Sequence, residues 1–350
     1  MKFTLKQNLL LYGFLTALSA HFAVAYAIGP KFYVDVAQYQ NGMAKLPFMY
    51  RALMAWTIHA FMQIQAFVDI VHRAQLPAPF DQPEIIVLTG INILSVIALT
   101  EFVRRSIAIF VEDPLLTAVL SFLMPLSMYF SYVALASNLK HSYPYDIPNL
   151  PLFAACIYGI LKRKLVLMQV SFLLACLSRE TSVFLIAIYL LYELDRLKSA
   201  PLQIAGNILL MGAVLALTKW ILFRMYEGNP LELETYAGGL FGLRLQENFI
   251  FLTHPQNWPN LLSSGGFLWV TLFATYKYLP KGPLRRTLWV AVPWVVLMGC
   301  VGLLTEVRVF GELTILLAIL SAVGIARYLK AHGFRSGDTA IRGPAAQSGR

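Results

Sequence analysis

Acidic and basic residues at the edges of long apolar runs are the strongest candidates for chemistry in this sequence. They are Asp35, Arg51, Asp146, Arg179, Glu180, Glu306 and Arg308. A charge at the centre of a membrane helix costs about 2.5–3.5 kcal/mol on insertion scales, so charges collected on one face indicate the wall of a site. A carboxylate there can act as a general base, and an arginine can hold phosphate oxygens in pairs.

The composition is that of a polytopic integral membrane protein. Hydrophobic residues make up 58% of the chain and charged residues 13%, and the charged share is about half of that usual in soluble domains. A soluble protein of this size could not bury so much apolar surface. The net charge of +10 does not indicate nucleic-acid binding, because the basic residues form short clusters between apolar runs, as the positive-inside rule requires.

The apolar runs predict an all-α membrane protein with ten transmembrane helices and both termini in the cytoplasm. The runs are Leu9–Ile28, Ile85–Val103, Leu115–Ser137, Asn149–Leu161, Leu165–Leu177, Thr181–Leu194, Gln203–Phe223, Leu261–Leu279, Thr287–Leu304 and Val309–Tyr328. The first run is interpreted as a retained helix, because it is too long for the apolar region of a signal peptide.

Three of these runs, at 149–161, 165–177 and 181–194, are short. Each gives about 20 Å of helix, whereas the hydrocarbon core is about 30 Å thick, so protein or a water-filled cavity must surround the helix ends. One continuous helix over 165–194 is the alternative interpretation.

The stretch Ala52–His72 is apolar but interrupted by polar residues, and we expect it to form a helix in the membrane interface. Its expected apolar face consists of Trp56, Ala60, Ile64, Phe67 and Val71. If this stretch does not span, nearly every basic cluster falls on the cytoplasmic side. We expect residues 1–330 to form one transmembrane domain and residues 331–350 a disordered, basic cytoplasmic tail.

The first outer loop, from Gly29 to about Glu84, carries the candidate general base. Asp35 and Tyr39 are four residues apart and would share a helix face. Arg51 follows in the segment Pro-Phe-Met-Tyr-Arg. A carboxylate at the mouth of a membrane cavity can activate an acceptor hydroxyl; the alternative is an interfacial acid that simply faces water.

A second outer loop contains Tyr143, Tyr145 and Asp146 between two prolines. Proline fixes the backbone, so this loop is expected to have a defined shape. Anchoring of the tyrosines at the membrane interface is the alternative to a binding role.

Two tips between apolar runs each carry a pair of opposite charges. Arg179 and Glu180 form the first, where the alternative is a helix N-cap at Ser178. Glu306 and Arg308 form the second, where the alternative is an ion pair from Arg308 to Glu312 on one helix face. An arginine at the end of a short helix is well suited to bind phosphate.

The three cysteines, Cys156, Cys176 and Cys300, lie inside apolar stretches without CxxC spacing and are interpreted as small buried hydrophobic residues. The sequence contains no phosphate-binding or dinucleotide-binding glycine motif and no HExxH or GxSxG motif. We therefore expect no cofactor.

Taken together, the outer-side motifs resemble those of bacterial members of the GT-C class of membrane glycosyltransferases. The motifs are Asp-x-x-x-Tyr after the first span, Pro-Phe-x-Tyr-Arg, Tyr-Pro-Tyr-Asp, Arg-Glu-Thr and a late Glu-x-Arg-x-Phe-x-Glu. The resemblance extends from Tyr33 to Glu312.

The resemblance implies a fold with interfacial helices in the first outer loop and a sugar donor linked to polyprenyl phosphate. It implies that Asp35 is the general base, that Arg179 and Arg308 hold the lipid phosphate, and that Asp146 and Glu180 position the sugar or the acceptor. Asp35 stands without the second acid common in the class, so no metal is expected. Acceptor selection is assigned to the loop Arg224–Asn260.

The expected activity is transfer of a sugar to an envelope polysaccharide, lipid or protein on the outer face of the bacterial cytoplasmic membrane. Tyr39, Arg51, Tyr143, Tyr145 and Glu306 complete the expected substrate-binding set. The alternatives are a transporter or lipid flippase, which would use the same charges near the midplane, and a non-catalytic partner in envelope polysaccharide assembly. No inverted repeat supports transport.

Overall fold

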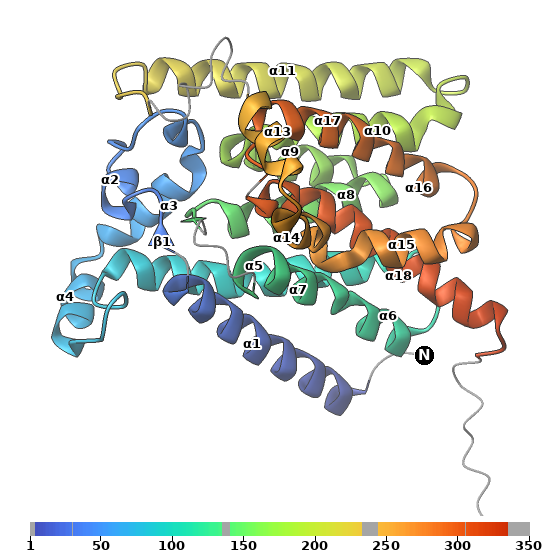
Figure 1. Cartoon of the computed structure of the whole chain (residues 1–350), viewed down its shortest axis with the longest axis horizontal. Coiled ribbons are helices and arrows are strands. Elements are labelled where there is room, and N and C mark those ends of the chain that lie inside the picture. Colours follow the sequence, from blue (N-terminus) through green and yellow to red (C-terminus); the bar gives the residue numbers. More distant parts are fainter. Residues whose placement is uncertain (1–3, 30, 135–140, 233–243, 305, 335–350) are drawn as a thin grey trace, which may run out of the picture.

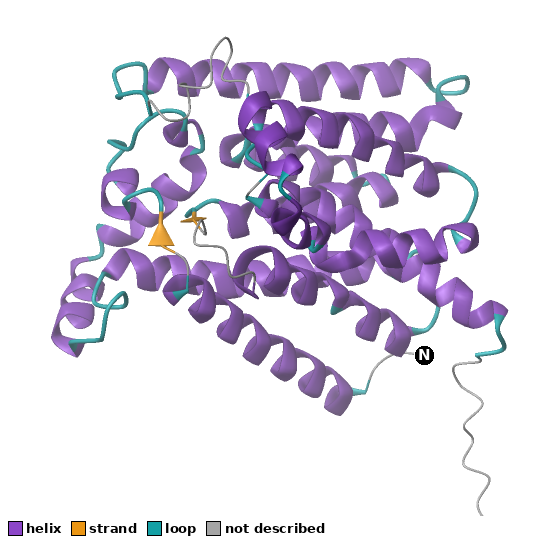
Figure 2. Cartoon of the chain, viewed as in Figure 1, coloured by secondary structure: helices purple, strands orange, loops and turns teal. Residues whose placement is uncertain are grey.

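The computed structural model describes residues 4–334 except 30, 135–140, 233–243 and 305. The described part of the chain is almost entirely helical, with one pair of two-residue strands (Figure 2). This confirms the all-α fold class. Most of the expected disordered tail at 331–350 lies outside the described residues.

Six helical segments are long and apolar enough to cross a membrane, within the part of the chain that is described. They are α1 (Leu5–Ile28), α5 (Pro83–Ile107), the α6–α7 segment (Pro114–Val133), α11 (Pro201–Met225), the α16–α17 segment (Pro283–Val301) and the α18 segment (Val307–Ala331). Their lengths suit a hydrocarbon core of about 30 Å. The chain is therefore a membrane-embedded helical protein.

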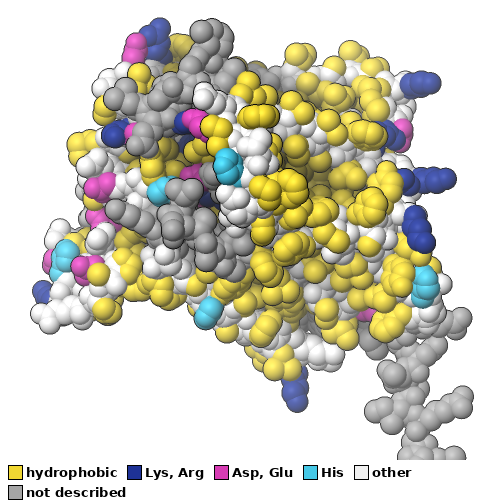
Figure 3. Space-filling model, viewed as in Figure 1, with side chains coloured by type: hydrophobic (Ala, Val, Ile, Leu, Met, Phe, Trp, Pro, Cys, Tyr) yellow, Lys and Arg dark blue, Asp and Glu magenta, His cyan; other side chains and the backbone are white. Residues whose placement is uncertain are grey.

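The long helices differ sharply in how much of their surface the protein covers. Only 17% of the most apolar stretch of α11 is buried, whereas 89% of that of α18 is buried. α11 exposes Leu202, Leu209 and Phe223 along its length. Hydrophobic side chains cover the middle of the molecule (Figure 3). Such a broad apolar surface belongs against lipid.

Three short helices fill the interior beside α18. They are α8 (Asp146–Lys162), α9 (Leu165–Ser178) and α10 (Val183–Glu193). The prediction of separate helices is confirmed and the alternative of one helix over 165–194 is wrong, because Arg179 is extended and Glu180–Ser182 forms a 3-10 turn. α8 begins three residues before the expected Asn149. These helices need not face lipid along their whole length because they pack against protein.

One end of the helix bundle carries the segments of the first outer loop (Figure 1). They are β1 (Lys31–Phe32), which pairs in parallel with β2 (His141–Ser142), then α2 (Val36–Gln40), α3 (Ala52–Met62) and α4 (Gln65–Ala74).

The expected single helix over Ala52–His72 is wrong in detail, because the chain breaks between α3 and α4. α3 buries Met54, Ala55 and Ile58 against protein, whereas Trp56 of the expected apolar face is 40% exposed. Polar residues around 63–65 interrupt the helix, and tertiary packing sets the buried face.

The opposite end of the bundle gathers basic connections. The carboxylate of Glu193, the last residue of α10, pairs with Arg163 at 2.9 Å and with Arg196 at 2.7 Å. Asp195 pairs with Arg286 at 2.7 Å. These contacts bring the connections α8–α9 and α10–α11 together with the last residue of α16. Figure 3 shows Lys and Arg side chains along one edge of the molecule.

The segment from 245 to 279 departs from its prediction. The expected loop 224–260 contains α13 (Leu245–Thr253) and α14 (Trp258–Leu262), while 233–243 lies outside the described residues. The expected span Leu261–Leu279 is broken, because residues 265–267 adopt left-handed backbone conformations and leave α15 only Leu268–Thr275. A Cβ on Gly266 would lie 2.5 Å from the Cα of Ser127, so this break lets two backbones approach closely.

Candidate functional site

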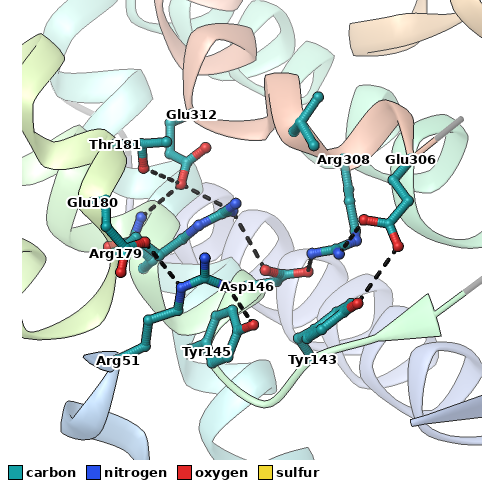
Figure 4. Close-up of polar contacts among 12 residues, drawn as sticks. Arg51, Tyr143, Tyr145, Asp146, Arg179, Glu180, Thr181, Glu306, Arg308 and Glu312 are labelled. Carbon is teal, nitrogen blue, oxygen red and sulfur yellow. Dashed lines mark hydrogen bonds and ion pairs between the residues drawn. The ribbon is translucent and has the colours of Figure 1, made fainter. Parts of the chain in front are cut away.

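Four segments distant in sequence bring their charged and polar side chains together at the end of the bundle nearest α2 and α3 (Figure 4). They are the start of α8, the α9–α10 break, the start of the α18 segment and the residue before α3. Nearly all of the predicted site residues meet here, namely Arg51, Tyr143, Tyr145, Asp146, Arg179, Glu180, Glu306 and Arg308. We call this set, with Glu312 and Lys219, the charge cluster.

Asp146 lies at the centre of the charge cluster and is fully buried. Its Oδ2 accepts from Nη1 of Arg308 at 2.7 Å, and its Oδ1 lies 3.4 Å from Nη1 of Arg179. Asp146 occupies the first turn of α8, where the helix dipole favours a negative charge. The acid therefore joins two buried arginines from different segments.

Glu312 is the second fully buried acid, in the first turn of α18. Its Oε1 lies 3.0 Å from Nη1 of Arg179 and accepts hydrogen bonds from Thr181 at 2.9 Å and Asn149 at 2.8 Å. The alternative pairing of Arg308 with Glu312 is therefore wrong. The two side chains take different partners because α18 begins between them, at Gly311.

The outer part of the charge cluster is a bridge between two cations. Oε2 of Glu180 accepts from Nε of Arg51 at 3.0 Å, and Oε1 lies 3.4 Å from Nζ of Lys219. The Glu180 side chain is 45% exposed. Desolvation raises the pKa of its carboxyl, but the charges of Arg51 and Lys219 outweigh it and lower the pKa to about 2.

This bridge has a defined pH dependence. A carboxyl whose pKa falls on folding stabilises the protein fully above its ordinary pKa of about 4.5 and loses that effect as the pH falls towards 2. We expect the melting-temperature difference between the wild type and Glu180→Gln to be constant from about pH 5 to 8 and to shrink below about pH 4. A difference that disappears already at neutral pH would contradict the assignment.

Arginine–tyrosine contacts line the cluster. The guanidinium of Arg308 lies 3.7 Å from the ring centroid of Tyr143 and also pairs with Glu306, while Arg51 lies 4.7 Å from the ring of Tyr145. Cation–π contact of this kind holds a guanidinium in place without neutralising it. Desolvation raises the pKa of Tyr145 to about 12, so its hydroxyl stays protonated.

Asp35 and Tyr39 occupy a different position from the other predicted residues. Asp35 is exposed and caps α2, accepting from the backbone N–H of Ala37 at 2.9 Å and of Gln38 at 3.1 Å. It has no ion pair with any described residue. Tyr39 is buried and donates to the backbone carbonyl of Arg51.

A stack of rings connects this loop to the charge cluster. The ring of Tyr33, two residues before Asp35, stacks 5.7 Å from that of Tyr143. Asp35 therefore lies beside the cluster rather than in it, and its catalytic role stays a prediction.

The formal charges of the cluster cancel. The cations are Arg51, Arg179, Lys219 and Arg308, and the acids are Asp146, Glu180, Glu306 and Glu312. A balanced set lowers the cost of holding so many charges in an apolar protein. Buried charges in a membrane protein nevertheless indicate a functional site by default.

Sequence reasoning omitted Lys219 and Glu312 from the predicted site. Lys219 lies seven residues before Tyr226, near the end of the otherwise apolar helix α11. A lone lysine inside a span is itself a signal that could have singled it out. Glu312 appears in the sequence analysis as a possible partner of Arg308 and as the last residue of the Glu-x-Arg-x-Phe-x-Glu motif, without a role in the site.

The described residues contain no group of three His, Cys, Asp or Glu side chains placed to hold a metal ion. Cys156 and Cys176 are buried, Cys300 is partly buried, and all three are free thiols. This agrees with their interpretation as apolar packing residues.

Comparison of the chain with protein-family models, with curated proteins and with solved structures gave no match. The assignment of an activity therefore depends on the motifs and the geometry described above.

Gly311 is the first residue of α18 and has no room for a side chain, so its replacement should destabilise the protein. A Cβ there would overlap the hydroxyl of Tyr132 and lie 3.6 Å from Leu150. We expect Gly311→Ala to destabilise the protein by about 1–3 kcal/mol, because the buried phenol must shift. Thermal unfolding in detergent measures this. Gly212→Ala, where no atom lies within 4 Å, is the control; equal melting temperatures would contradict the prediction.

Proposed function

We propose that this protein is a membrane glycosyltransferase of the GT-C type. In this proposal it has ten transmembrane helices and both termini in the cytoplasm, and it transfers a sugar from a polyprenyl-phosphate donor on the outer face of a bacterial cytoplasmic membrane. The acceptor is an envelope polysaccharide, lipid or protein.

One observation carries the proposal: arginines and a lysine from four segments gather with carboxylates at a single end of the bundle, next to the short helices of the first outer loop. Sugar transfer from a phosphate leaving group needs positive charge near the departing phosphate and a base near the incoming hydroxyl. The cluster supplies the cations, and the adjacent loop supplies exposed Asp35.

The proposed topology is supported by the distribution of basic connections. Arg163, Arg196 and Arg286 lie together at the opposite end of the bundle, as expected for a cytoplasmic face. The short helices α8–α10 and the broken α15 are the four additional spans that bring the six long segments to ten. The ends that carry Asp146, Arg179 and Thr181 are buried in protein, which makes spanning feasible at reduced length.

In the proposed reaction, Asp35 accepts the proton of the acceptor hydroxyl. The hydroxyl oxygen then forms a bond to the anomeric carbon of the donor sugar, and the bond from that carbon to the phosphate oxygen breaks. The phosphate leaves with the bonding electrons, and cations of the cluster stabilise its charge. In this proposal the buried rings of Tyr143 and Tyr145 hold Arg308 and Arg51 by cation–π contact, and Asp146 keeps Arg179 and Arg308 in position.

The proposal is tested with the purified full-length chain in lipid nanodiscs. A panel of polyprenyl-phosphate sugars labelled in the sugar is supplied together with envelope glycans and lipids as acceptors. We expect transfer of label from one donor, with release of polyprenyl phosphate. Movement of a lipid-linked sugar across proteoliposomes without a new glycosidic bond would favour the flippase alternative. If no donor binds, the proposal is wrong.

A further inference from the structure

Glu180 differs from the buried acids of the charge cluster because its side chain has access to water and can rotate away from its two cations. Asp146 and Glu312 are fully buried, whereas the side chain of Glu180 is 45% exposed. A buried carboxylate that releases an arginine leaves both charges unpaired in an apolar interior, which is costly. Glu180 can instead turn to water when it releases its cations.

The two oxygens of Glu180 each face a different cation. Nε of Arg51 is 3.0 Å from one oxygen and Nζ of Lys219 is 3.4 Å from the other. Lys219 is further held by a 3.1 Å hydrogen bond from Nζ to the backbone carbonyl of Tyr50. An anion with two or more oxygens can bridge these cations as the carboxylate does, and phosphate, like carboxylate, is an anion that arginine and lysine bind through several oxygens.

The cation pair also lies next to a helix that exposes apolar side chains. Lys219 belongs to α11, the least buried of the long helices. Phe223, one turn after Lys219 on the same helix face, is 50% exposed, and Leu217 and Trp220 on other faces of α11 are 57% and 59% exposed. The ring of Phe223 packs 4.2 Å from that of Tyr50, beside the lysine's backbone partner. A headgroup held at Lys219 therefore leaves its hydrocarbon chain against the apolar surface of α11.

We propose that Arg51 and Lys219 bind the phosphate of a long-chain isoprenoid lipid, and that the Glu180 carboxylate occupies this phosphate position in the empty protein. This inference rests on the proposed function and revises two expected roles. Glu180 competes with the donor rather than positioning the sugar. Arg179 and Arg308, each held by buried carboxylates, keep the site in shape rather than capture the phosphate.

The proposal predicts that substitutions at Glu180 and at Lys219, which form one ion pair, change the affinity for polyprenyl monophosphate in opposite directions. Glu180→Gln removes the competing charge but keeps the size of the side chain, so its affinity for polyprenyl monophosphate should rise about threefold to tenfold. Lys219→Gln removes a charged donor and should lower that affinity about tenfold or more. Binding is measured with the full chain in neutral-lipid nanodiscs.

A second lysine–glutamate pair provides the matched control. Lys45 and Glu232 pair at 3.0 Å without taking part in the charge cluster, so Lys45→Gln and Glu232→Gln should leave the affinity unchanged. Inorganic phosphate and phosphatidylglycerol are tested as competitors. We expect weak competition from both, because the first lacks a chain and the second has two chains and a diester headgroup.

The outcomes separate this inference from the proposed function. If the wild type binds no polyprenyl phosphate, both are wrong. If it binds and Glu180→Gln weakens binding or leaves it unchanged, the exchange of carboxylate for phosphate is wrong while the glycosyltransferase proposal stands. Full competition by inorganic phosphate at equal concentration would show that the apolar surface of α11 contributes nothing. The Glu180→Gln result decides even if Lys219→Gln fails to fold.

Discussion

Replacement of Arg179 by leucine is expected to destabilise the protein by about 3–5 kcal/mol, because two buried carboxylates would lose a cationic partner. Arg179 Nη1 lies within 3.4 Å of both Asp146 and Glu312, and those acids are fully buried. In this variant Asp146 would keep its ion pair with Arg308, but Glu312 would keep only hydrogen bonds from the uncharged side chains of Thr181 and Asn149. Thermal unfolding in detergent measures the loss, and a low yield of folded protein is the same result in a stronger form.

The matched control for this variant is Arg224→Leu. Arg224 pairs with Glu227 at 3.3 Å, and both side chains are more than two-thirds exposed. Exposed ion pairs contribute about 0–1 kcal/mol, so the melting temperature should hardly change. If the two variants melt at the same temperature, the buried cluster is not an important source of stability.

Asp35→Asn is expected to lower sugar transfer by about 10²- to 10⁴-fold, the usual contribution of a general base. Asparagine caps a helix as well as aspartate does, and Asp35 caps α2 through a single carboxylate oxygen. The variant therefore removes the proton acceptor while keeping the local structure. Labelled-sugar transfer is measured beside the melting temperature, which should not move.

Asp113 supplies the control, because it caps α6 with the same pair of hydrogen bonds, to the backbone N–H of Leu115 and Leu116. Asp113→Asn should retain both stability and transfer. Full transfer by Asp35→Asn would remove Asp35 from the catalytic role, and loss of transfer in both variants would indicate a capping effect.

The elements that carry the site follow from local sequence features. Arg179 and Glu180 interrupt an apolar stretch, and the chain breaks there because two charges cannot lie along a helix packed in apolar protein. The glycine pair Gly265–Gly266 has the character of loop or close-packing glycines, and it breaks the expected span 261–279. From sequence alone, an apolar run with two glycines can form one continuous helix or two helices. Here the backbone of Gly266 packs closely against Ser127, and this contact favours the broken form.

The partners within the site could not be predicted from the sequence. Asp146 and Arg308 are 162 residues apart, and Glu180 and Lys219 are 39 residues apart. Charge alone allowed Arg308 to pair with Glu312, and only the packing of α8, α9 and α18 selects Asp146 instead. Positions at helix ends were predictable because they depend on local pattern, whereas pairings depend on the packing of distant segments.

The burial of α18 affects how the protein is assembled. This helix follows all the other described helices along the chain, yet it is the most buried of the six long apolar segments. The earlier helices must therefore enter the bilayer while a vacant slot remains among them. When α18 fills that slot it also delivers Glu312 to Arg179, so completion of the core and neutralisation of a buried arginine occur as one event. A chain arrested before α18 would lack Glu312, and Asp146, at 3.4 Å, would be the remaining carboxylate beside Arg179.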